Sequence, residues 1–222
     1  MKLPSRFSLA AFVLAGLAAA SHAQDAPATP GKAQEKLVEF KDIKVQVQKT
    51  PDFATKGSTT DKRWKPKDWI EIEPEFKTER PAGEKKSEVV PELTFKYYVF
   101  LNSSVKENAR VLTAEVTHTN VPIDEVSHSV VYISPSTILK VTGRPEGNVG
   151  LVSYYAVEVV TGSETVGFYS KGPKGVSKNP NDNGAKWWSA PSAPPQEPAL
   201  LSKPQSPFGP LWGDFHADVK PK

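Results

Sequence analysis

The sequence predicts an all-β fold. β-Branched and aromatic residues alternate with polar residues in short runs, which is typical of strands that bury one face. Groups of Gly, Pro, Asn and Ser separate these runs, and no comparable window carries the apolar stripe of a helix. Roughly seven short strands with turns between them are typical of an immunoglobulin-like β-sandwich, although a small barrel would give the same periodicity.

The predicted strands follow one another through residues 36–172, which we expect to be the sandwich. Ile43 and Val45 share one face of the first run, and Tyr97 and Val99 share one face of the third. The turn at 161–163 is short enough for a hairpin, so the last two runs should pair antiparallel. The seven runs are Leu37–Val47, Trp69–Phe76, Leu93–Leu101, Arg110–Thr117, Ser129–Ile133 with a possible continuation through Val141, Leu151–Val160 and Thr165–Ser170.

The second run carries three acids at alternate positions. Ile70 and Ile72 occupy the opposite face, so the acids are predicted on its solvent side rather than in a catalytic pair. These acids are Glu71, Glu73 and Glu75.

The first 23 residues have the features of a signal peptide. Lys2 and Arg6 give a positive start, an uncharged apolar run follows, and small residues before Ala23 predict cleavage there. The run is shorter than the roughly 20 apolar residues of a membrane-spanning helix, although an uncleaved anchor is the alternative. We therefore expect an exported protein, periplasmic or associated with the outer membrane or cell surface, with no integral membrane segment after cleavage.

Composition narrows the function. Residues 24–35 are rich in Ala, Pro and Thr and should form a flexible leader. Loss of residues 1–23 removes Lys2, Arg6 and no acid, so the formal net charge falls from +3 to +1. This balance gives no basic footprint for nucleic acid. The absence of Cys excludes a disulfide framework, thiol nucleophiles and thiolate metal sites.

Residues 173–222 differ in composition from the rest. They contain 10 of the 21 prolines, which favours an extended segment, but they are also rich in aromatic residues, which disordered segments lack. We predict a Pro-rich aromatic arm that packs on the domain or on a partner. Its aromatic residues are Trp187, Trp188, Phe208, Trp212 and Phe215.

No catalytic or metal constellation stands out. His118 and His128 could meet across a hairpin, with Asp124 or Glu125 nearby, but they read more simply as exposed histidines beside a turn. A Gly-x-Ser-x-Gly elbow is missing, and the glycine-bearing loops lack the strand-to-helix context of a phosphate site. The sequence predicts no enzyme, no cofactor and no metal.

Aromatic residues are the candidates for partner binding. Trp64 stands among cations in the stretch 62–67, which could contact an anionic surface or be a solvated loop. In each Tyr-Tyr pair, 97–98 and 154–155, one ring should point outward, either to bind a sugar or to be covered by the arm. The candidates are Trp187, Trp188, Trp212, Phe215, Tyr98, Tyr155 and Trp64.

Two segments carry a resemblance to a known family, Lys96–Asn102 and Tyr132–Ser136. With the signal peptide and the cysteine-free sandwich, the chain resembles the small Ig-like pilus-associated envelope proteins of verrucomicrobial bacteria. The resemblance implies a non-enzymatic interaction protein, accessory to a type IV pilus-like system, with envelope or pilus-like machinery proteins as partners. A carbohydrate-binding sandwich module that takes a glycan is the alternative.

Overall fold

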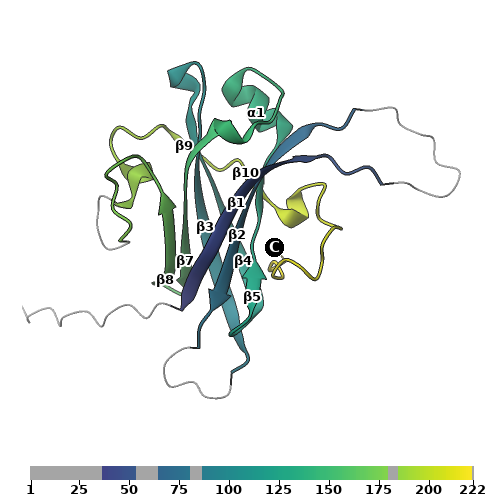
Figure 1. Ribbon diagram of the computed structural model, residues 1–222, viewed down its shortest axis with the longest axis vertical. Coiled ribbons are helices and arrows are strands. Elements are labelled where there is room, and N and C mark those ends of the chain that lie inside the picture. The colour runs from purple at the N-terminus through teal and green to yellow at the C-terminus, as the bar shows by residue number, and fades with distance from the viewer. Residues whose placement is uncertain (1–36, 54–64, 81–86, 180–184, 222) are drawn as a thin grey trace, which may run out of the picture. The chain divides into compact units, whose positions relative to one another are not determined.

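Two β-sheets packed face to face form the described part of the chain (Figure 1). The computed structural model describes residues 37–53, 65–80, 87–179 and 185–221, which belong to one compact unit, Ala33–Lys222. The predicted signal peptide, the leader and Trp64 lie outside the described residues. The strands are β1 (Val38–Lys49), β2 (Asp68–Thr78), β3 (Val89–Leu101), β4 (Arg110–Pro122), β5 (Val126–His128), β6 (Val131–Ile133), β7 (Val152–Thr161), β8 (Glu164–Lys171), β9 (Gln196–Glu197) and β10 (Leu200–Ser202).

Sheet A contains β1, β2, β6 and β10 in that order, and β5 pairs with another stretch of β2. Sheet B has the order β8-β7-β3-β4-β9. The sandwich prediction is confirmed, with ten strands in the described residues in place of about seven. The additional strands are β9 and β10, which come from the Pro-rich arm, and β5, which Ser129 and Val130 separate from β6.

The core lies between the sheets, and strand alternation fills it. Ile70, Ile72 and Phe76 of β2 point inward and are fully buried. They face Phe95 and Tyr97 of β3, which are also fully buried. The predicted hairpin of β7 and β8 is confirmed as an antiparallel pair.

The possible continuation of the fifth run through Val141 is wrong, because this segment is the helix α1 (Pro135–Thr142). Ser134 caps its start by accepting a hydrogen bond from the Thr137 amide, and Pro135 occupies the first turn, where it needs no donor. Gly143 ends the helix with a left-handed φ of 72°. These end signals outweigh the β-branched content of the segment.

The edge strand β1 is poorly suited to pairing with another chain. Its register with β2 shifts between Phe40 and Asp42, and Lys41 and Lys44 project from it as exposed side chains. Irregular register and edge lysines both disfavour the addition of a further strand. A partner is therefore better sought on other surfaces.

The C-terminal arm wraps the sandwich. The 3-10 helix η4 (Trp187–Ser189) packs on the outer face of sheet B, and the segment around η5 (Lys203–Gln205) packs on that of sheet A. The arm adds β9 to β4 and β10 to β6. Near its end the Thr119 amide donates to the Asp218 carbonyl (3.1 Å), which returns the chain to β4.

Candidate functional site

The outer face of sheet B carries what we call the Trp clasp, Trp187 and Trp188 of η4. The Trp188 ring stacks on Tyr98 with centroids 4.3 Å apart and planes 15° apart. The Trp187 indole N–H donates to the Ser170 hydroxyl (3.2 Å). A Cβ at Gly172 would stand 2.7 Å from the Trp187 ring, so the close approach of the arm needs glycine there. Both indoles are buried, at 8% and 3% exposure, and Tyr98 is partly buried against them.

In the second tyrosine pair, Tyr154 and not the candidate Tyr155 points outward. Tyr155 is 7% exposed and belongs to the core between the sheets, so the prediction that Tyr155 offers a surface ring is wrong. Its neighbour Tyr154 points outward and is half-buried against the Trp clasp. Burial raises the pKa of Tyr155 to about 12, and the neighbouring Tyr169 raises it further as a smaller cause.

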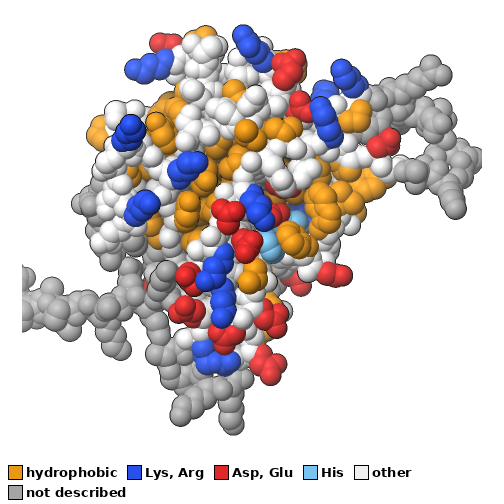
Figure 2. All heavy atoms as spheres, viewed as in Figure 1, with side chains coloured by type: hydrophobic (Ala, Val, Ile, Leu, Met, Phe, Trp, Pro, Cys, Tyr) orange, Lys and Arg blue, Asp and Glu red, His pale blue; other side chains and the backbone are white. Residues whose placement is uncertain are grey.

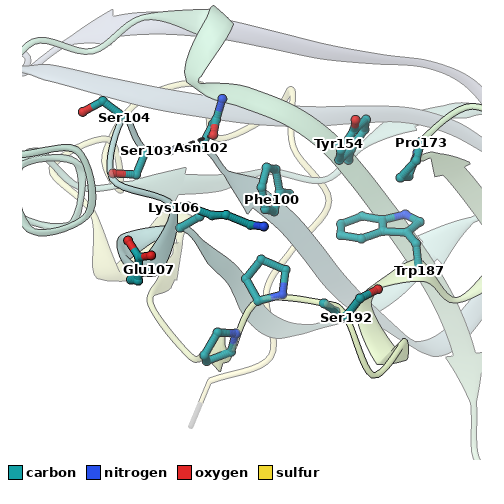
Figure 3. Close-up of a pocket in the computed structure, with 14 residues that line it drawn as sticks. Phe100, Asn102, Ser103, Ser104, Lys106, Glu107, Tyr154, Pro173, Trp187 and Ser192 are labelled. Carbon is teal, nitrogen blue, oxygen red and sulfur yellow. Dashed lines mark hydrogen bonds between the residues drawn. The ribbon is translucent and has the colours of Figure 1, made fainter.

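An open groove of about 730 Å³ lies beside the Trp clasp (Figure 3). Phe100 and Tyr154 form its floor with ring centroids 5.5 Å apart, and Trp187 stands 5.9 Å from Tyr154. One wall is the connection between β3 and β4, residues 102–109, and the other is arm residues 192–195. This volume falls within the roughly 300–1,000 Å³ of small-ligand sites. We call it the aromatic groove.

A polar contact lies on the outer face of sheet A. Glu73 of β2 faces two histidines, with His128 Nδ1 3.5 Å from Oε1 and His216 Nε2 3.2 Å from Oε2. Burial would raise the pKa of the Glu73 carboxyl, but the hydrogen bond and charge of His216, with His128 and Lys44, outweigh it and hold the pKa below its usual value. Burial lowers the pKa of His128 despite the nearby Glu73.

The prediction that the acids of β2 face solvent is therefore wrong for two of the three. Glu71 and Glu73 are only 1% and 6% exposed. A side chain of β1 covers Glu71, and His216 of the arm covers Glu73. Glu71 accepts a hydrogen bond from the Gln46 side chain of β1 (2.6 Å). The prediction that Glu71 and Glu73 lie on the face opposite Ile70 and Ile72 is correct. A strand pattern does not reveal that residues far along the chain cover that face.

His118 forms a buried chain of hydrogen bonds under the arm's end. Its Nδ1 lies 3.0 Å from the Ala217 carbonyl, and its Nε2 lies 2.6 Å from the Ser129 hydroxyl, which also accepts from the Tyr97 hydroxyl (2.6 Å). Because a carbonyl only accepts, Nδ1 carries the proton and Nε2 accepts from Ser129. Burial lowers the pKa of His118 to about 4 despite its backbone hydrogen bonds. The interpretation of His118 and His128 as exposed is wrong, since they are 1% and 8% exposed.

These five residues form what we call the tail seam, because together they hold the end of the arm. They are Glu73, His118, His128, Ser129 and His216. Ser129 and His118 have the distance of a nucleophile and a base, but both are almost fully buried, so a substrate has no access to the hydroxyl. The tail seam is a structural contact.

Two arm aromatics are exposed, unlike the Trp clasp. Trp212 is 46% and Phe215 48% exposed, and Phe215 stacks on His128 with centroids 3.9 Å apart. Figure 2 shows hydrophobic side chains uncovered beside the pale-blue histidines on this face. Trp212 has a left-handed backbone φ of 52°, and the ammonium of the buried Lys203 donates to its carbonyl (2.9 Å). We call this surface the Trp212–Phe215 ridge.

The described residues hold no group of three or more His, Cys, Asp or Glu side chains arranged for a metal ion. Within the same residues, no helix has the length and apolar character to cross a membrane.

Sequence reasoning missed the aromatic groove. Phe100 lies in the predicted run Leu93–Leu101 and Tyr154 in the run Leu151–Val160, but neither is among the binding candidates, and no prediction includes Lys106. A signal existed, since Phe100 and Tyr154 each follow or precede a core residue, Val99 and Tyr155, and so point to the outer face of their strands. Their pairing register, Phe100 opposite Tyr154, was not available from the periodicity.

Comparison with known proteins gives a matching family and similar solved structures. A protein-family model matches residues 29–222. A crystal structure of a protein from Akkermansia muciniphila, a verrucomicrobial bacterium, has a TM-score of 0.69 and 28% sequence identity. The alignment covers 84% of this chain and 94% of that one. No curated protein matches the sequence.

Proposed function

We propose, from the premise that this chain belongs to the family matched over residues 29–222, that it is a non-enzymatic interaction protein of the cell envelope, accessory to a type IV pilus-like system. The similarity to a verrucomicrobial structure supports the resemblance seen in the sequence. The signal-like N-terminus supports an exported protein. The partners would be proteins of the envelope or of the pilus-like machinery.

The Trp212–Phe215 ridge is the observation that carries this proposal. A left-handed backbone costs a residue other than glycine roughly 1–2 kcal/mol, and Trp212 meets that cost while its ring stays half exposed. The Trp212 ring contacts Phe208 with centroids 6.3 Å apart, and this contact does little to offset the backbone strain. Strained residues are concentrated at binding sites, and Trp is enriched where protein partners contact each other.

The test compares two double variants of the tagged full-length chain in cross-linked native envelopes. Trp212→Ala with Phe215→Ala removes the ridge, and Leu139→Ala with Val149→Ala removes two side chains of similar exposure, 48% and 47%, elsewhere. We expect quantitative mass spectrometry to find pilus-system components enriched with the unaltered chain and with the control. With the ridge variant, the enrichment of these components should be at least tenfold lower than with the unaltered chain.

Thermal midpoints within about 3 °C of the unaltered chain would show that both variants are folded. Equal enrichment with the ridge variant and the control would place the contact elsewhere. Absence of every pilus-system component from the material recovered with the unaltered chain would reject the accessory role.

A further inference from the structure

The aromatic groove has a floor that suits the flat face of a sugar ring. Phe100 and Tyr154 are half-buried, so each presents part of its ring to the groove, and Trp187 lines it beside Tyr154. An aromatic face is electron-rich, and the C–H bonds on one face of a pyranose are its natural complement. The floor is also fixed, because Tyr154 lies on β7 and Phe100 on β3, which are paired.

The wall opposite the arm supplies hydrogen-bond donors. The Asn102 side-chain oxygen accepts from the Ser103 amide (2.9 Å), and the Ser103 hydroxyl accepts from the Val105 amide (3.2 Å). These turn bonds occupy the acceptors and leave the Asn102 amide hydrogens and the Ser103 hydroxyl hydrogen for a ligand. A ligand rich in oxygen acceptors therefore fits this wall.

Lys106 gives the groove a charge. In Figure 3 its ammonium extends over the groove toward Phe100, whereas the Glu107 carboxylate points to the other side. In the described part of the chain Lys106 enters no ion pair within 4.0 Å, while the nearby Arg110 and Lys140 both pair with Glu197. An exposed lysine without an ion-pair partner beside an aromatic floor favours an anionic ligand.

A proline-rich peptide, the other common occupant of aromatic grooves, fits less well. Such peptides dock in aromatic-lined grooves as a polyproline II helix. The Trp187 N–H already donates to the Ser170 hydroxyl, so it is not available to a peptide carbonyl, and the arm's own Pro194 and Pro195 form the wall opposite residues 102–109. The remaining space has aromatic ring faces on its floor and the donors of Asn102 and Ser103 on one wall, which suits a sugar better than a peptide.

We propose that the aromatic groove binds an anionic saccharide, with Phe100 and Tyr154 against the face of a sugar ring and Lys106 paired with its carboxylate or sulfate group. The donors of Asn102 and Ser103 would bind its hydroxyl oxygens. This site is separate from the Trp212–Phe215 ridge, so either proposal can fail without the other.

The test is calorimetric titration of the full-length protein with four probes at low salt. These are an oligogalacturonate, a sulfated galactan oligosaccharide, a neutral galactan oligosaccharide of the same length, and a proline-rich acidic peptide. We expect one or both anionic sugars to bind at least tenfold more tightly than the neutral sugar. The advantage should shrink at an ionic strength of about 1 M, where charges are screened beyond roughly 3 Å. The two anionic sugars distinguish carboxylate from sulfate recognition.

Three variants assign the residues. Lys106→Met should reduce the affinity for the anionic sugar to that for the neutral sugar, and Tyr154→Ala should weaken both by about tenfold or more. Lys41→Met removes an exposed lysine of β1 and should change neither. No binding of any sugar at millimolar concentration, equal affinity for charged and neutral sugars, an unaltered Lys106→Met variant, or preference for the peptide would each overturn the proposal.

Discussion

The same arm covers the two outer faces of the sandwich by different means. Over sheet B, the Trp clasp contacts rings, with Trp188 stacked on Tyr98. Over sheet A, Phe208 also stacks on Tyr132, but at the arm's end the tail seam adds a polar contact, which joins Glu73 to His128 and His216. Ring contacts are insensitive to protonation, whereas a buried carboxylate-histidine contact depends on the charge of each partner. The two ends of the arm should therefore respond differently to mutation and to pH.

The Trp212–Phe215 ridge adjoins the tail seam, where Phe215 stacks on His128, but its own rings stay largely uncovered. Its rings are near 50% exposed, while the rings of the Trp clasp are below 10%. The arm thus contains tryptophans of two kinds, one group that stabilises the fold and one that is displayed. Composition does not separate them, since both occur among prolines.

Truncation of Trp188 should have the largest effect. Trp188→Ala removes a ring that is 3% exposed and should lower the free energy of unfolding by about 3–5 kcal/mol, as large truncations in buried sites do. Trp212→Ala should lower it by less than about 1 kcal/mol, because half of that ring is already in water. Urea unfolding followed by circular dichroism measures both. Equal losses would mean that the two tryptophans do not differ in role.

Acid should weaken the tail seam. In the unfolded chain His118 takes up a proton near its ordinary pKa of 6.5, but in the folded chain its pKa is about 4. Between pH 6.5 and pH 4 the unfolded state binds more protons than the folded state. The contribution of His118 to the free energy of unfolding is therefore fully present above pH 6.5 and is lost as the pH falls toward 4. The loss should reach roughly 3 kcal/mol, at about 1.4 kcal/mol for each pH unit of the shift. Urea midpoints at pH 7, 6, 5 and 4 measure it.

Two variants sharpen this prediction. His118→Gln removes the titrating ring, so it should reduce the loss between pH 7 and pH 5 whatever its stability at pH 7. Trp188→Ala should keep the pH dependence of the unaltered chain, because the Trp clasp lacks His118. If the His118→Gln chain loses as much stability as the unaltered chain, the acid response comes from other groups, with Glu73 and His128 next to be replaced.

The sandwich was predictable because strand alternation is a local property. Phe95, Tyr97 and Val99 alternate with their neighbours wherever the chain leads, and a buried face is the outcome. The hairpin of β7 and β8 was predictable for the same reason, since Gly162 with its φ of 58° fits the short turn.

The surroundings of the outer faces were not predictable. The placement of Glu73 beside His216 depends on a contact across 143 positions of sequence. That of Tyr98 under Trp188 depends on the route of an arm whose prolines predict no single path. Both outward residues look solvent-exposed from their own strand, and only a tertiary contact changes that. The helix α1 was missed although its signals, Pro135 and Gly143, are local.

The smallest expected effect concerns the backbone at Trp212. Glycine adopts a φ of 52° freely, whereas alanine there costs roughly 1–2 kcal/mol, partly offset by the larger chain entropy that glycine loses on folding, so Trp212→Gly should be more stable than Trp212→Ala. Phe215 is the matched control, since it is similarly exposed and does not have a positive φ, and there alanine should be the more stable variant. Thermal midpoints of the four variants decide the matter. If alanine were the more stable at both positions, the backbone at Trp212 would not be strained, and the main support for a displayed tryptophan would be lost.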